Sequence, residues 1–354
     1  MSLIPLSAQA ALTQLDQFDT VIDARSPAEY ALDHLPGAVN WPTLDDAQRV
    51  EIGTLYKQVN PFEARKRGAA MAARNIAAHV ERELIATPKH WNALAYCWRG
   101  GQRSGALALV LSQIGFRIHL LEGGYKAFRA AMVQDIAARS SALRFRVVCG
   151  PTGSGKTRLL QALAAQGAQV LDLEDLANHR SSVLGAVPGL AQPSQKHFET
   201  RIWTRLRRFG GERPVYAECE SQKVGNLTVP LPLIHALRAS ACLTLDLPLS
   251  ARVALLLKDY AHLTRDPESL CARLDTLVAL RGRAVVGAWQ ARVRLGDHAG
   301  VVADLLRDHY DLAYGQSTAR HFSQFGQAPV YALPDANDDT MQAMARALVE
   351  ADTP

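Results

Sequence analysis

The sequence predicts two α/β domains in succession, residues 1–138 and 144–354, the second built on a parallel sheet with a helical insertion. Three observations indicate this. Short β-like runs alternate with helical runs from Thr20 to about Ala138. A polar stretch at residues 139–143 then precedes a new apolar strand. Beyond it, strands recur with helices between them, as βαβ units require.

In the first domain the pattern predicts strands and helices in alternation. The expected elements, in order, are a strand at residues 20–24, a helix at 27–32, a strand at 37–42, an Ala-rich helix around 63–85, a strand at 94–97, a helix from Gly105, a strand from His119 and a last helix to about 138.

In the second domain β-like runs stand at residues 144–149, 170–173, 214–218, 242–247 and 329–333. Between about residues 249 and 318 the pattern is helical almost throughout, which is longer than one crossover needs. We therefore expect a helical insertion there.

The composition excludes several classes of protein. Hydrophobic residues make up 48% and charged residues 21%, which disfavours disorder and a coiled-coil rod. The longest aliphatic runs are far shorter than the roughly 18 residues of a membrane span, and no basic region opens a signal peptide. Five cysteines without a CxxC pair argue against a disulfide framework or a cysteine zinc site. We expect a cytoplasmic monomer without membrane contact, and the net charge of +5 favours anionic partners only mildly.

Cys97 stands between an apolar strand and a Gly-rich turn that leads into a helix. Such a turn directs backbone N–H groups inward, and Arg99 and Arg103 add positive charge, so an anion is favoured at its centre. These surroundings lower a cysteine pKa from about 8.5 to between about 3.5 and 7.5. We expect Cys97 to be a nucleophilic thiolate served by Arg99 and Arg103; the alternative is a small buried apolar side chain.

Two neighbouring stretches, VIDARSPAEYALDHLPGAVNWP and LLEGGYKAFRA, resemble the rhodanese (sulfurtransferase) family over residues 10–138. The spacing from Cys97 to Arg103 also matches the C-x5-R motif of cysteine-dependent phosphatases, although Tyr96 stands where those enzymes usually carry histidine. Either family implies a loop that holds a tetrahedral, phosphate-like group. The residues that we expect to stabilise turns and ion pairs, outside the site, are Asp23, Arg25, His34, Pro36 and Gly37.

Residues 150–157 read GPTGSGKT, a full match to the phosphate-binding loop (P-loop) motif, after a strand and before a helix. The glycines let the backbone curl around a diphosphate, Lys156 supplies a positive charge, and Thr157 can hold Mg²⁺. The alternative is a helix-capping turn without a ligand. The expected phosphate- and donor-binding residues here are Gly150, Gly153, Ser154, Gly155, Lys156 and Thr157.

Two further polar stretches are expected at the carboxyl edge of this sheet. Glu218 ends a strand and Glu220 follows, where this fold places metal-facing carboxylates; a solvated surface pair is the alternative. Residues 172–185 form a polar segment with Asp172, Glu174, His179, Arg180 and two serines. We expect His179 and Arg180 to contact a phosphate or an RNA backbone, or to cap the next helix.

Arg201, Arg205 and Arg208 have helical spacing, so they can share one face. Such a face can follow RNA phosphates, but an ordinary solvated helix has the same pattern. We favour RNA because of the resemblance that follows.

Five stretches occur in order along the chain: YCWRGGQRS, GPTGSGKT, DLEDLANHR, QPSQKHFE and ECESQKVG. This combination of a rhodanese-like domain fused to a P-loop domain resembles the tRNA 2-selenouridine synthase family over nearly the whole chain. A tyrosine-bearing helix, HYDLAY, fits the same pattern.

The resemblance implies a two-step modification of the wobble uridine in the tRNA anticodon loop. The sulfur of 2-thiouridine is geranylated from geranyl diphosphate, and the S-geranyl group is then replaced by selenium from selenophosphate. By resemblance, selenium is handled at Cys97, either as a bound selenide or as selenophosphate in the loop of residues 99–103. The P-loop then holds the donor's diphosphate, with Lys156, Thr157 and Mg²⁺ stabilising it as it leaves.

Two other function classes stay open from the residues. One is a P-loop ATPase or kinase with an accessory sulfurtransferase, and the other is a rhodanese-fold, phosphatase-like regulator with an inactive P-loop. The remaining cysteines, at positions 149, 219, 242 and 271, are interpreted as core residues.

Overall fold

The computed structural model describes residues 3–180, 189–261 and 265–352, which form two compact units. The first comprises residues 1–136 with 193–204, and the second comprises 137–192 with 205–354. The expected boundary at residues 139–143 falls mostly inside helix α6 (Gly124–Ala142), because Arg139 and the two serines fit a helix as well as a loop. The parts of the expected ranges at 181–188, 262–264 and 353–354 lie outside the described residues.

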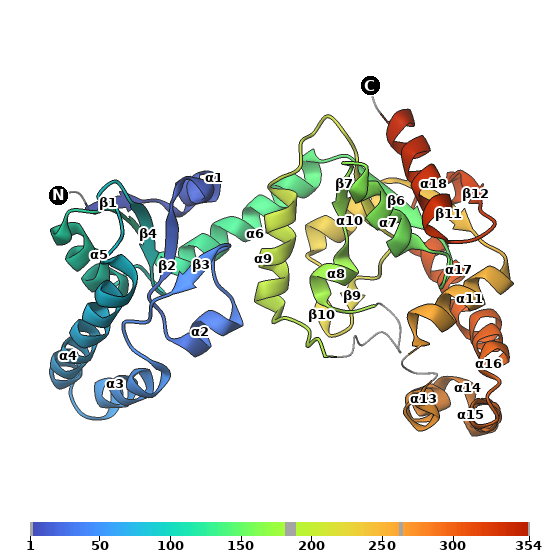
Figure 1. The fold of residues 1–354 in the computed structure, drawn as a ribbon, viewed down its shortest axis with the longest axis horizontal. Helices are drawn as coiled ribbons and strands as arrows, with labels where there is room; N and C mark the ends of the chain where they lie inside the picture. The colour runs from blue at the N-terminus through green and yellow to red at the C-terminus, as the bar shows by residue number, and fades with distance from the viewer. Residues whose placement is uncertain (1–2, 181–188, 262–264, 353–354) are drawn as a thin grey trace. The chain divides into compact units, whose positions relative to one another are not determined.

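A five-stranded parallel sheet forms the centre of the first unit, with strand order β1-β5-β4-β2-β3 (Figure 1). Strand β4 lies in the middle, where Ala93 pairs with Thr20 on one side and Ile118 on the other. The strands are β1 (Leu3–Leu6), β2 (Thr20–Asp23), β3 (Ala38–Asn40), β4 (Asn92–Tyr96) and β5 (Arg117–Leu121).

The helices of this unit follow the expected order. They are α1 (Ala8–Gln14), a short 3-10 turn (Leu15–Gln17), α2 (Pro27–Leu32), α3 (Asp46–Gln58), α4 (Pro61–His79), a π-helical turn (Val80–Leu84), α5 (Gln102–Ile114), most of α6, and residues 195–204 of α9 (Gln195–Leu206). Strand β1 and helices α1 and α3 were not expected from the sequence, and the Ala-rich helix expected around residues 63–85 is α4 followed by the π-helical turn. Helix α5 begins at Gln102, before the expected Gly105, because Gly101 is its N-cap. Arg103 therefore lies in the first helical turn.

The second unit has its own five-stranded parallel sheet, with strand order β12-β11-β6-β8-β7. Strand β6 lies in the centre, between β11 and β8. Its strands are β6 (Phe145–Cys149), β7 (Gln169–Leu171), β8 (Val215–Glu218), β11 (Ala241–Asp246) and β12 (Val330–Ala332), and a small hairpin joins β9 (Lys223–Val224) to β10 (Leu227–Thr228). The α/β prediction is confirmed for both units.

Helices cover this sheet and form the expected insertion. The covering helices are α7 (Lys156–Ala165), α8 (Leu173–Ala177), α10 (Leu231–Ala239) and α18 (Asp338–Ala351). The insertion contains α11 (Leu249–Asp259), α13 (Pro267–Leu274), a 3-10 turn (Asp275–Leu277), α14 (Val278–Arg281), α15 (Arg283–Arg294), α16 (His298–Leu305), a π-helical turn (Leu306–Tyr310) and α17 (Asp311–His321), followed by a 3-10 turn (Phe325–Gln327). Leu274, Trp289 and Val293 belong to its separate small core.

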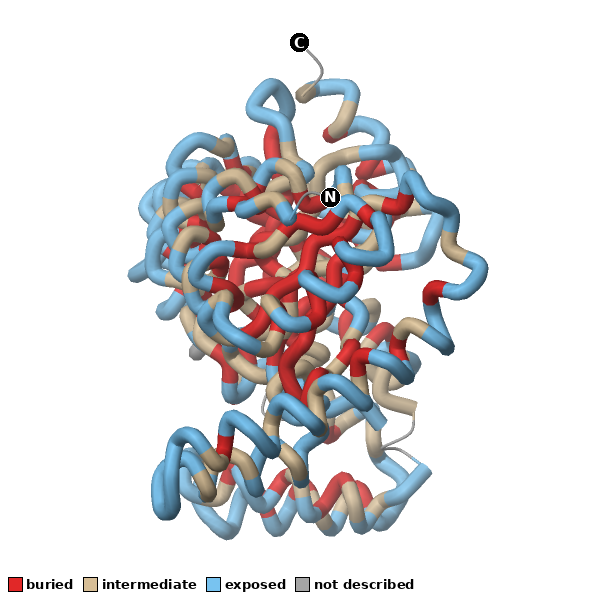
Figure 2. The backbone as a smooth tube through the Cα atoms, turned by 90° about the vertical axis from the view of Figure 1, so that its left-hand side faces the viewer, coloured by how far each residue is buried: buried red, intermediate tan, exposed pale blue. Residues whose placement is uncertain are grey.

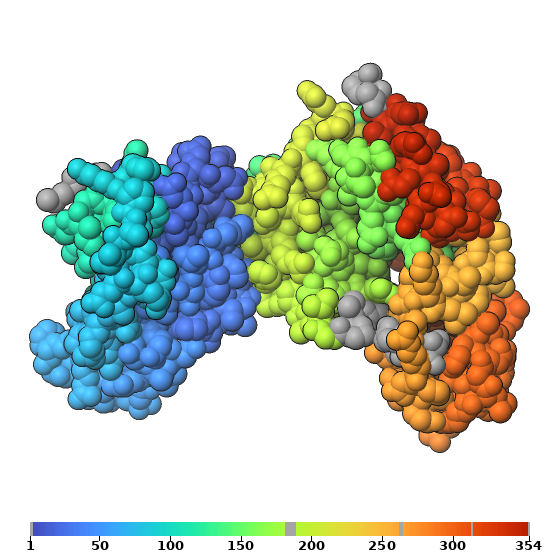
Figure 3. Space-filling model, viewed as in Figure 1, coloured from blue at the N-terminus to red at the C-terminus, as the bar shows by residue number. Residues whose placement is uncertain are grey.

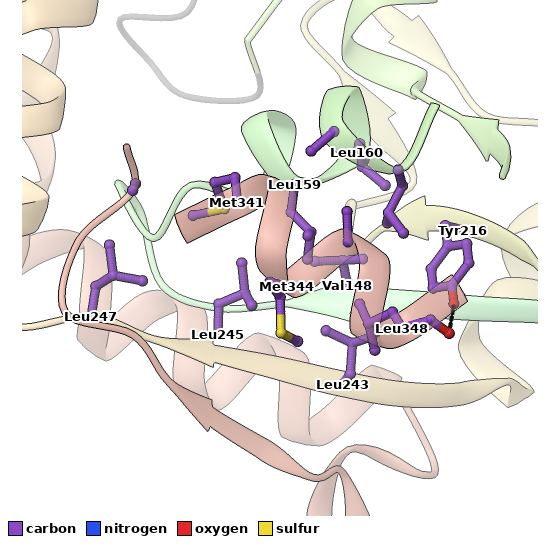
Figure 4. Close-up of a cluster of buried hydrophobic side chains, with 14 of the residues drawn as sticks. Val148, Leu159, Leu160, Tyr216, Leu243, Leu245, Leu247, Met341, Met344 and Leu348 are labelled. Carbon is purple, nitrogen blue, oxygen red and sulfur yellow. Dashed lines mark hydrogen bonds between the residues drawn. The ribbon is translucent and has the colours of Figure 1, made fainter. Parts of the chain in front are cut away.

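The main core of the second unit lies between the sheet and the helices α7 and α18. Figure 4 shows Met344 and Leu348 of α18 beside Leu243 of the sheet, and the Tyr216 hydroxyl donating to the Leu348 carbonyl. In Figure 3 the red surface of α18 lies directly beside the green surface of the α7 region. Since α7 directly follows the P-loop, this core fixes the base of that loop.

Many of the most deeply buried side chains lie on the central strands of the two sheets. Figure 2 shows the buried stretches of the backbone in red towards the interior and the exposed residues in pale blue on the outer turns. Among the described residues, no helix combines the length and apolar character needed to cross a membrane.

Candidate functional sites

Cys97 follows the central strand β4 and begins a tightly packed loop. The backbone N–H of Tyr125 donates to the Cys97 carbonyl at 2.8 Å, which ties the loop to the start of α6. A Cβ atom at Gly124 would lie 2.3 Å from that carbonyl and 2.4 Å from the Gly100 nitrogen. Gly100 and Gly124 also have positive φ angles, of 66° and 60°. Only glycine fits here, so the glycines of two separated stretches shape this loop.

The surroundings of the Cys97 thiol favour its anionic form. The Gly101 N–H donates to Sγ at 3.2 Å. Burial raises the pKa of Cys97, but hydrogen bonds from the Ser104 hydroxyl and backbone, the charge of Arg103 and the Gly101 N–H outweigh it, and the pKa is lowered. The Ser104 hydroxyl is buried and is engaged by no described group other than the thiol, so it is available to donate to the thiolate.

The two arginines of this loop have different surroundings. Arg103 lies 2.5 Å from the Glu29 carboxylate in a largely buried ion pair, so part of its charge is already matched. Arg99 is exposed. The arrangement can accept an anion at Arg99 and the backbone N–H groups, with Arg103 acting mainly through its charge on the thiol.

Three of the residues that the sequence assigned to a supporting role, Asp23, Arg25 and His34, make internal contacts. Arg25 donates to Asp23 at 2.6 Å, both side chains are buried, and the Tyr96 hydroxyl donates to the same carboxylate at 2.7 Å. His34 stacks on Tyr30 at 4.0 Å between ring centroids. Tyr96 therefore points into an internal network and does not take the place of the phosphatase histidine.

Residues 193–204 add side chains beside the Cys97 loop that the sequence did not assign there. The Lys196 ammonium lies 5.5 Å from the centre of the Trp98 ring. Below it, the buried Asp33 carboxylate accepts from Tyr125 at 2.7 Å, Thr200 at 3.1 Å and His197 at 3.3 Å. The stretch QPSQKHFE, which contains Lys196 and His197, belongs to the family resemblance, but its position beside this loop could not be predicted because the contact joins residues 164 apart in the chain.

The P-loop has the geometry that its motif predicts. Gly150, Gly153 and Gly155 have positive φ angles of 148°, 79° and 82°. The Lys156 ammonium donates to the Gly150 carbonyl at 2.8 Å, so the lysine curls back across the loop. The Ser154 hydroxyl is buried and has no hydrogen-bond partner among the described residues. A loop of this shape presents backbone N–H groups and one cation to an anion.

Both predicted carboxylates meet a third one at the carboxyl edge of the sheet. Oxygen atoms of Glu174, Glu218 and Glu220 all lie within 4.8 Å of one another. Glu218 and Glu220 are buried, which overturns the solvated-pair alternative. Burial, followed by the charges of Glu174, Glu220 and Asp172, raises the pKa of Glu218 well above its usual value. Clustered carboxylate oxygens near Thr157 are the hard ligands that Mg²⁺ prefers, so these residues fit that ion.

The segment after β7 is not the continuous polar loop expected from the sequence. Residues 173–177 form helix α8, with the Asp172 carboxylate accepting from the Asp175 N–H as N-cap. His179 and Arg180 follow the helix, and the Arg180 guanidinium lies 5.0 Å from the centre of the Tyr260 ring. Ser181 and Ser182 lie outside the described residues.

The helical insertion supplies functional candidates that the sequence reasoning missed. Arg252 of α11 donates to the Thr152 carbonyl of the P-loop at 2.9 Å. The Gly150 N–H donates to the Tyr314 hydroxyl of α17 at 2.7 Å. Tyr314 belongs to the HYDLAY stretch, which was a usable signal; Arg252 lies in no recognisable motif.

A cavity of about 1130 Å³ brings most of the second-unit candidates together. It is lined by Gly153, Ser154, Gly155, Lys156, Thr157, His179, Arg180, Arg205, Glu218 and Glu220. The Cys97 loop belongs to the other unit, so the candidates form two sites.

The predicted arginine face is only partly helical. Arg201 and Arg205 are on α9, but that helix ends at Leu206, so Arg208 lies beyond it. Arg205 and Arg208 are exposed, and Arg205 lines the cavity. Cysteines 149, 219, 242 and 271 are all buried, as expected, and Cys219 also lines the cavity.

Two family models match separate parts of the chain. A model of the rhodanese-like domain family matches residues 7–131, and one of the tRNA 2-selenouridine synthase AAA domain matches residues 143–275.

Curated relatives align across both regions. A tRNA 2-selenouridine synthase of Nitrosomonas europaea is 37% identical over 254 residues, which cover 70% of this chain and 66% of that protein. A tRNA 2-selenouridine synthase from Aeromonas salmonicida is 33% identical, and the match covers 74% of this chain and 70% of that protein. One from Verminephrobacter eiseniae is 33% identical over 329 residues, covering 83% and 87%.

Two solved structures overlap with about a third of the chain each. An N-terminal domain of an ATP/GTP binding protein from Clostridium difficile 630 is 33% identical, covers 36% of this chain and 97% of that one, and has a TM-score of 0.31. A rhodanese-related protein from Thermoplasma volcanium is 18% identical, covers 35% and 89%, and has a TM-score of 0.24.

Proposed function

Because this chain belongs to the tRNA 2-selenouridine synthase family, we propose that it geranylates wobble 2-thiouridine in tRNA and then replaces the S-geranyl group with selenium. Geranyl diphosphate and selenophosphate are the co-substrates. The observation that carries the proposal is the presence, in one chain, of two anion-binding loops: one with an activated thiol at Cys97 and one with the P-loop ammonium of Lys156.

The first step belongs to the P-loop cavity. The sulfur of 2-thiouridine attacks C1 of the geranyl group, the carbon–oxygen bond breaks, and diphosphate leaves. Lys156 and the N–H groups of residues 150–157 bind that diphosphate and stabilise the charge that grows on it. Thr157, Glu218 and Glu220 would hold Mg²⁺, which supplies further charge neutralisation when bound.

The second step belongs to the Cys97 loop. The S-geranyl group makes the sulfur a good leaving group, so a selenium nucleophile can attack C2 of the base and expel geranylthiol. The lowered pKa of Cys97 and the exposed Arg99 support a loop that handles an anionic selenium donor. In the first route selenophosphate lies in the loop: its selenium attacks C2, geranylthiol leaves, and water then cleaves the selenium–phosphorus bond and releases phosphate. In the second route the Cys97 thiolate attacks the selenium of selenophosphate, a sulfur–selenium bond forms, and phosphite leaves before the bound selenium attacks C2. A selenium adduct on Cys97, sought by intact-protein mass spectrometry, separates these two routes.

Two variants test this division. Cys97→Ser is expected to form S-geranyl-2-thiouridine and to install no selenium, with Cys271→Ser as the matched control for a buried thiol outside the loop. Lys156→Ala is expected to lose geranyl transfer, whereas Lys89→Ala, at an exposed lysine of the first unit, is expected to leave it unchanged. Mass spectrometry of digested tRNA reads both products. Loss of both steps in Cys97→Ser, or full geranylation by Lys156→Ala, contradicts the proposal.

The tRNA anticodon loop is the proposed partner, and exposed Arg205 at the cavity is the proposed phosphate contact. Arg205→Glu is expected to weaken tRNA binding and to reduce its dependence on salt concentration. Arg213→Glu serves as a charge-matched control. Rapid ATP hydrolysis without tRNA would instead favour the ATPase alternative that the P-loop motif permits.

A further inference from the structure

Helices α11 and α17 bring apolar and aromatic side chains directly against the P-loop. A Cβ atom placed at Gly153 would lie 3.1 Å from two carbons of the Leu256 side chain. The Lys156 ammonium lies 5.4 Å from the centre of the Tyr314 ring. The walls nearest the loop on this side are therefore a leucine and an aromatic ring.

These walls are fixed in place. Arg252, one helical turn before Leu256, donates to the Thr152 carbonyl and binds the Asp311 carboxylate through both terminal nitrogens, at 2.6 and 3.0 Å. The Tyr314 hydroxyl accepts a hydrogen bond from the Gly150 N–H. The first turns of α11 and α17 are thus clamped to the loop, so the space beside them is preformed.

The cavity extends from the P-loop along this wall. Its lining there includes Leu255, Leu256, Tyr260, Tyr310, Tyr314 and Phe322. Six apolar or aromatic side chains next to a diphosphate-binding loop match a ligand with a charged head and a hydrocarbon body. The same helices also line the cavity with Lys258, Asp259, Ser317, Thr318 and His321, so polar partners for a nucleobase edge are present as well, and binding experiments must separate the two ligands.

We propose that the helical insertion forms the binding pocket for the isoprenoid tail of the donor, with Leu256 and Tyr314 as its walls next to the diphosphate. This inference rests on the proposed function and deepens it. Because Leu256 touches the loop, its size sets how much of the chain fits beside the head group. The insertion then determines which prenyl diphosphate the P-loop accepts, while the loop itself binds only the head.

Binding of the full chain to inorganic pyrophosphate and to geranyl diphosphate tests the pocket without turnover. Geranyl diphosphate is expected to bind at least about tenfold more tightly than inorganic pyrophosphate. Each methylene of the tail that becomes buried raises the binding affinity by close to a factor of four. Leu256→Trp is expected to reduce that advantage by about tenfold and to leave pyrophosphate affinity within about twofold. Leu249→Trp, on the exposed first residue of the same helix, is the matched control and is expected to change neither.

Donor length gives the second measurement. Leu256→Ala is expected to shift binding from geranyl towards farnesyl diphosphate, and Leu256→Trp towards dimethylallyl diphosphate. An unchanged preference in both variants overturns the tail pocket. So does a result in which Leu256→Trp weakens ATP binding but not geranyl diphosphate binding, because that outcome assigns the wall to a nucleoside.

The tail pocket and the proposed function can be overturned independently of each other. If geranyl diphosphate binds with the expected advantage but tRNA gains no geranyl group, the proposed function is wrong and the tail pocket stands. If tRNA is geranylated and the Leu256 variants keep the wild-type preference, the tail pocket is wrong and the proposed function stands. Thermal unfolding of each variant confirms that it folds, and Leu256→Ala replaces Leu256→Trp if the larger side chain prevents folding.

Discussion

Arg252 and Asp311 form a two-pronged ion pair that holds the P-loop from the helical insertion. The terminal nitrogens of Arg252 bind the two Asp311 oxygens at 2.6 and 3.0 Å, and its Nε donates to the Thr152 carbonyl at 2.9 Å. Arg252 is buried, with 5% of its surface exposed. One guanidinium thus connects α11, α17 and the loop.

Replacing Arg252 is expected to destabilise the second unit. Arg252→Ala leaves Asp311 without this partner and the Thr152 carbonyl without its donor, at a cost of about 3 kcal/mol. Pyrophosphate binding is expected to weaken as well. Urea unfolding and pyrophosphate titration measure the two effects. Arg294→Ala, which breaks an exposed pair with Glu268, is the control and is expected to cost below about 1 kcal/mol. Equal costs for the two variants contradict the clamp.

Because Gly124 lies so close to the Cys97 loop, its replacement by alanine is expected to impair selenium insertion selectively. In Gly124→Ala the new methyl group meets the Cys97 carbonyl at 2.3 Å, so the loop must move, at a cost of about 3 kcal/mol. Selenium insertion is expected to fall while geranyl transfer persists.

Gly115→Ala separates this clash from backbone strain. Gly115 also has a positive φ, of 116°, but no atom lies within 4 Å of its Cβ position. It is expected to cost about 1 kcal/mol and to keep both steps. If the two alanine variants behave alike in tRNA product analysis, the backbone contact does not shape the site.

The Ser104 hydroxyl is expected to tune the Cys97 thiol. Its hydrogen bond stabilises the thiolate, so Ser104→Ala is expected to raise the pKa of Cys97 from its lowered value. At a fixed pH near neutral the thiolate fraction then falls. The pH dependence of iodoacetamide alkylation, followed on the Cys97 peptide by mass spectrometry, measures the change. Ser112→Ala, on the same helix but bonded to the Leu109 carbonyl, is the control. A shift equal to that of Ser112→Ala would rule out this role.

Asp33 is expected to make the first unit sensitive to acid. Burial raises the pKa of Asp33, but hydrogen bonds from His197, Tyr125 and Thr200 and the charge of Arg129 outweigh it, so the pKa of Asp33 in the folded protein lies below its usual range. The stabilisation is therefore fully present above about pH 4 and is lost as pH falls through the folded pKa.

Asp33→Asn removes that titration. Its stability is expected to depend less on pH than the wild type in urea unfolding between about pH 3 and 6. Asp16→Asn, at an exposed carboxylate of the same unit, is the control and is expected to follow the wild-type profile. A wild-type profile for Asp33→Asn as well would show that the network does not carry the acid sensitivity.

The geometries of the P-loop and of the loop that follows Cys97 could each be predicted from a short stretch of sequence. GPTGSGKT predicts the P-loop because its glycines adopt backbone angles that other residues avoid. The run from Cys97 to Arg103 predicts a loop that turns N–H groups toward a thiol, and the 3.2 Å bond from Gly101 agrees. The start of α5 was placed too late, because the three glycines around it weaken the helical pattern.

The amino-acid sequence by itself predicted the two α/β units, the P-loop and the glycine-rich turn after Cys97, because these depend on local backbone preferences and hydrophobic periodicity; it did not predict strand β1. Tertiary structure alone decided that Arg103 pairs with Glu29, that Glu174 joins Glu218 and Glu220, that residues 193–204 pack with the first unit, and that Leu256, Arg252 and Tyr314 border the P-loop. Those contacts join residues far apart in the chain, and their energy comes from burial and charge pairing, which no short window of sequence records.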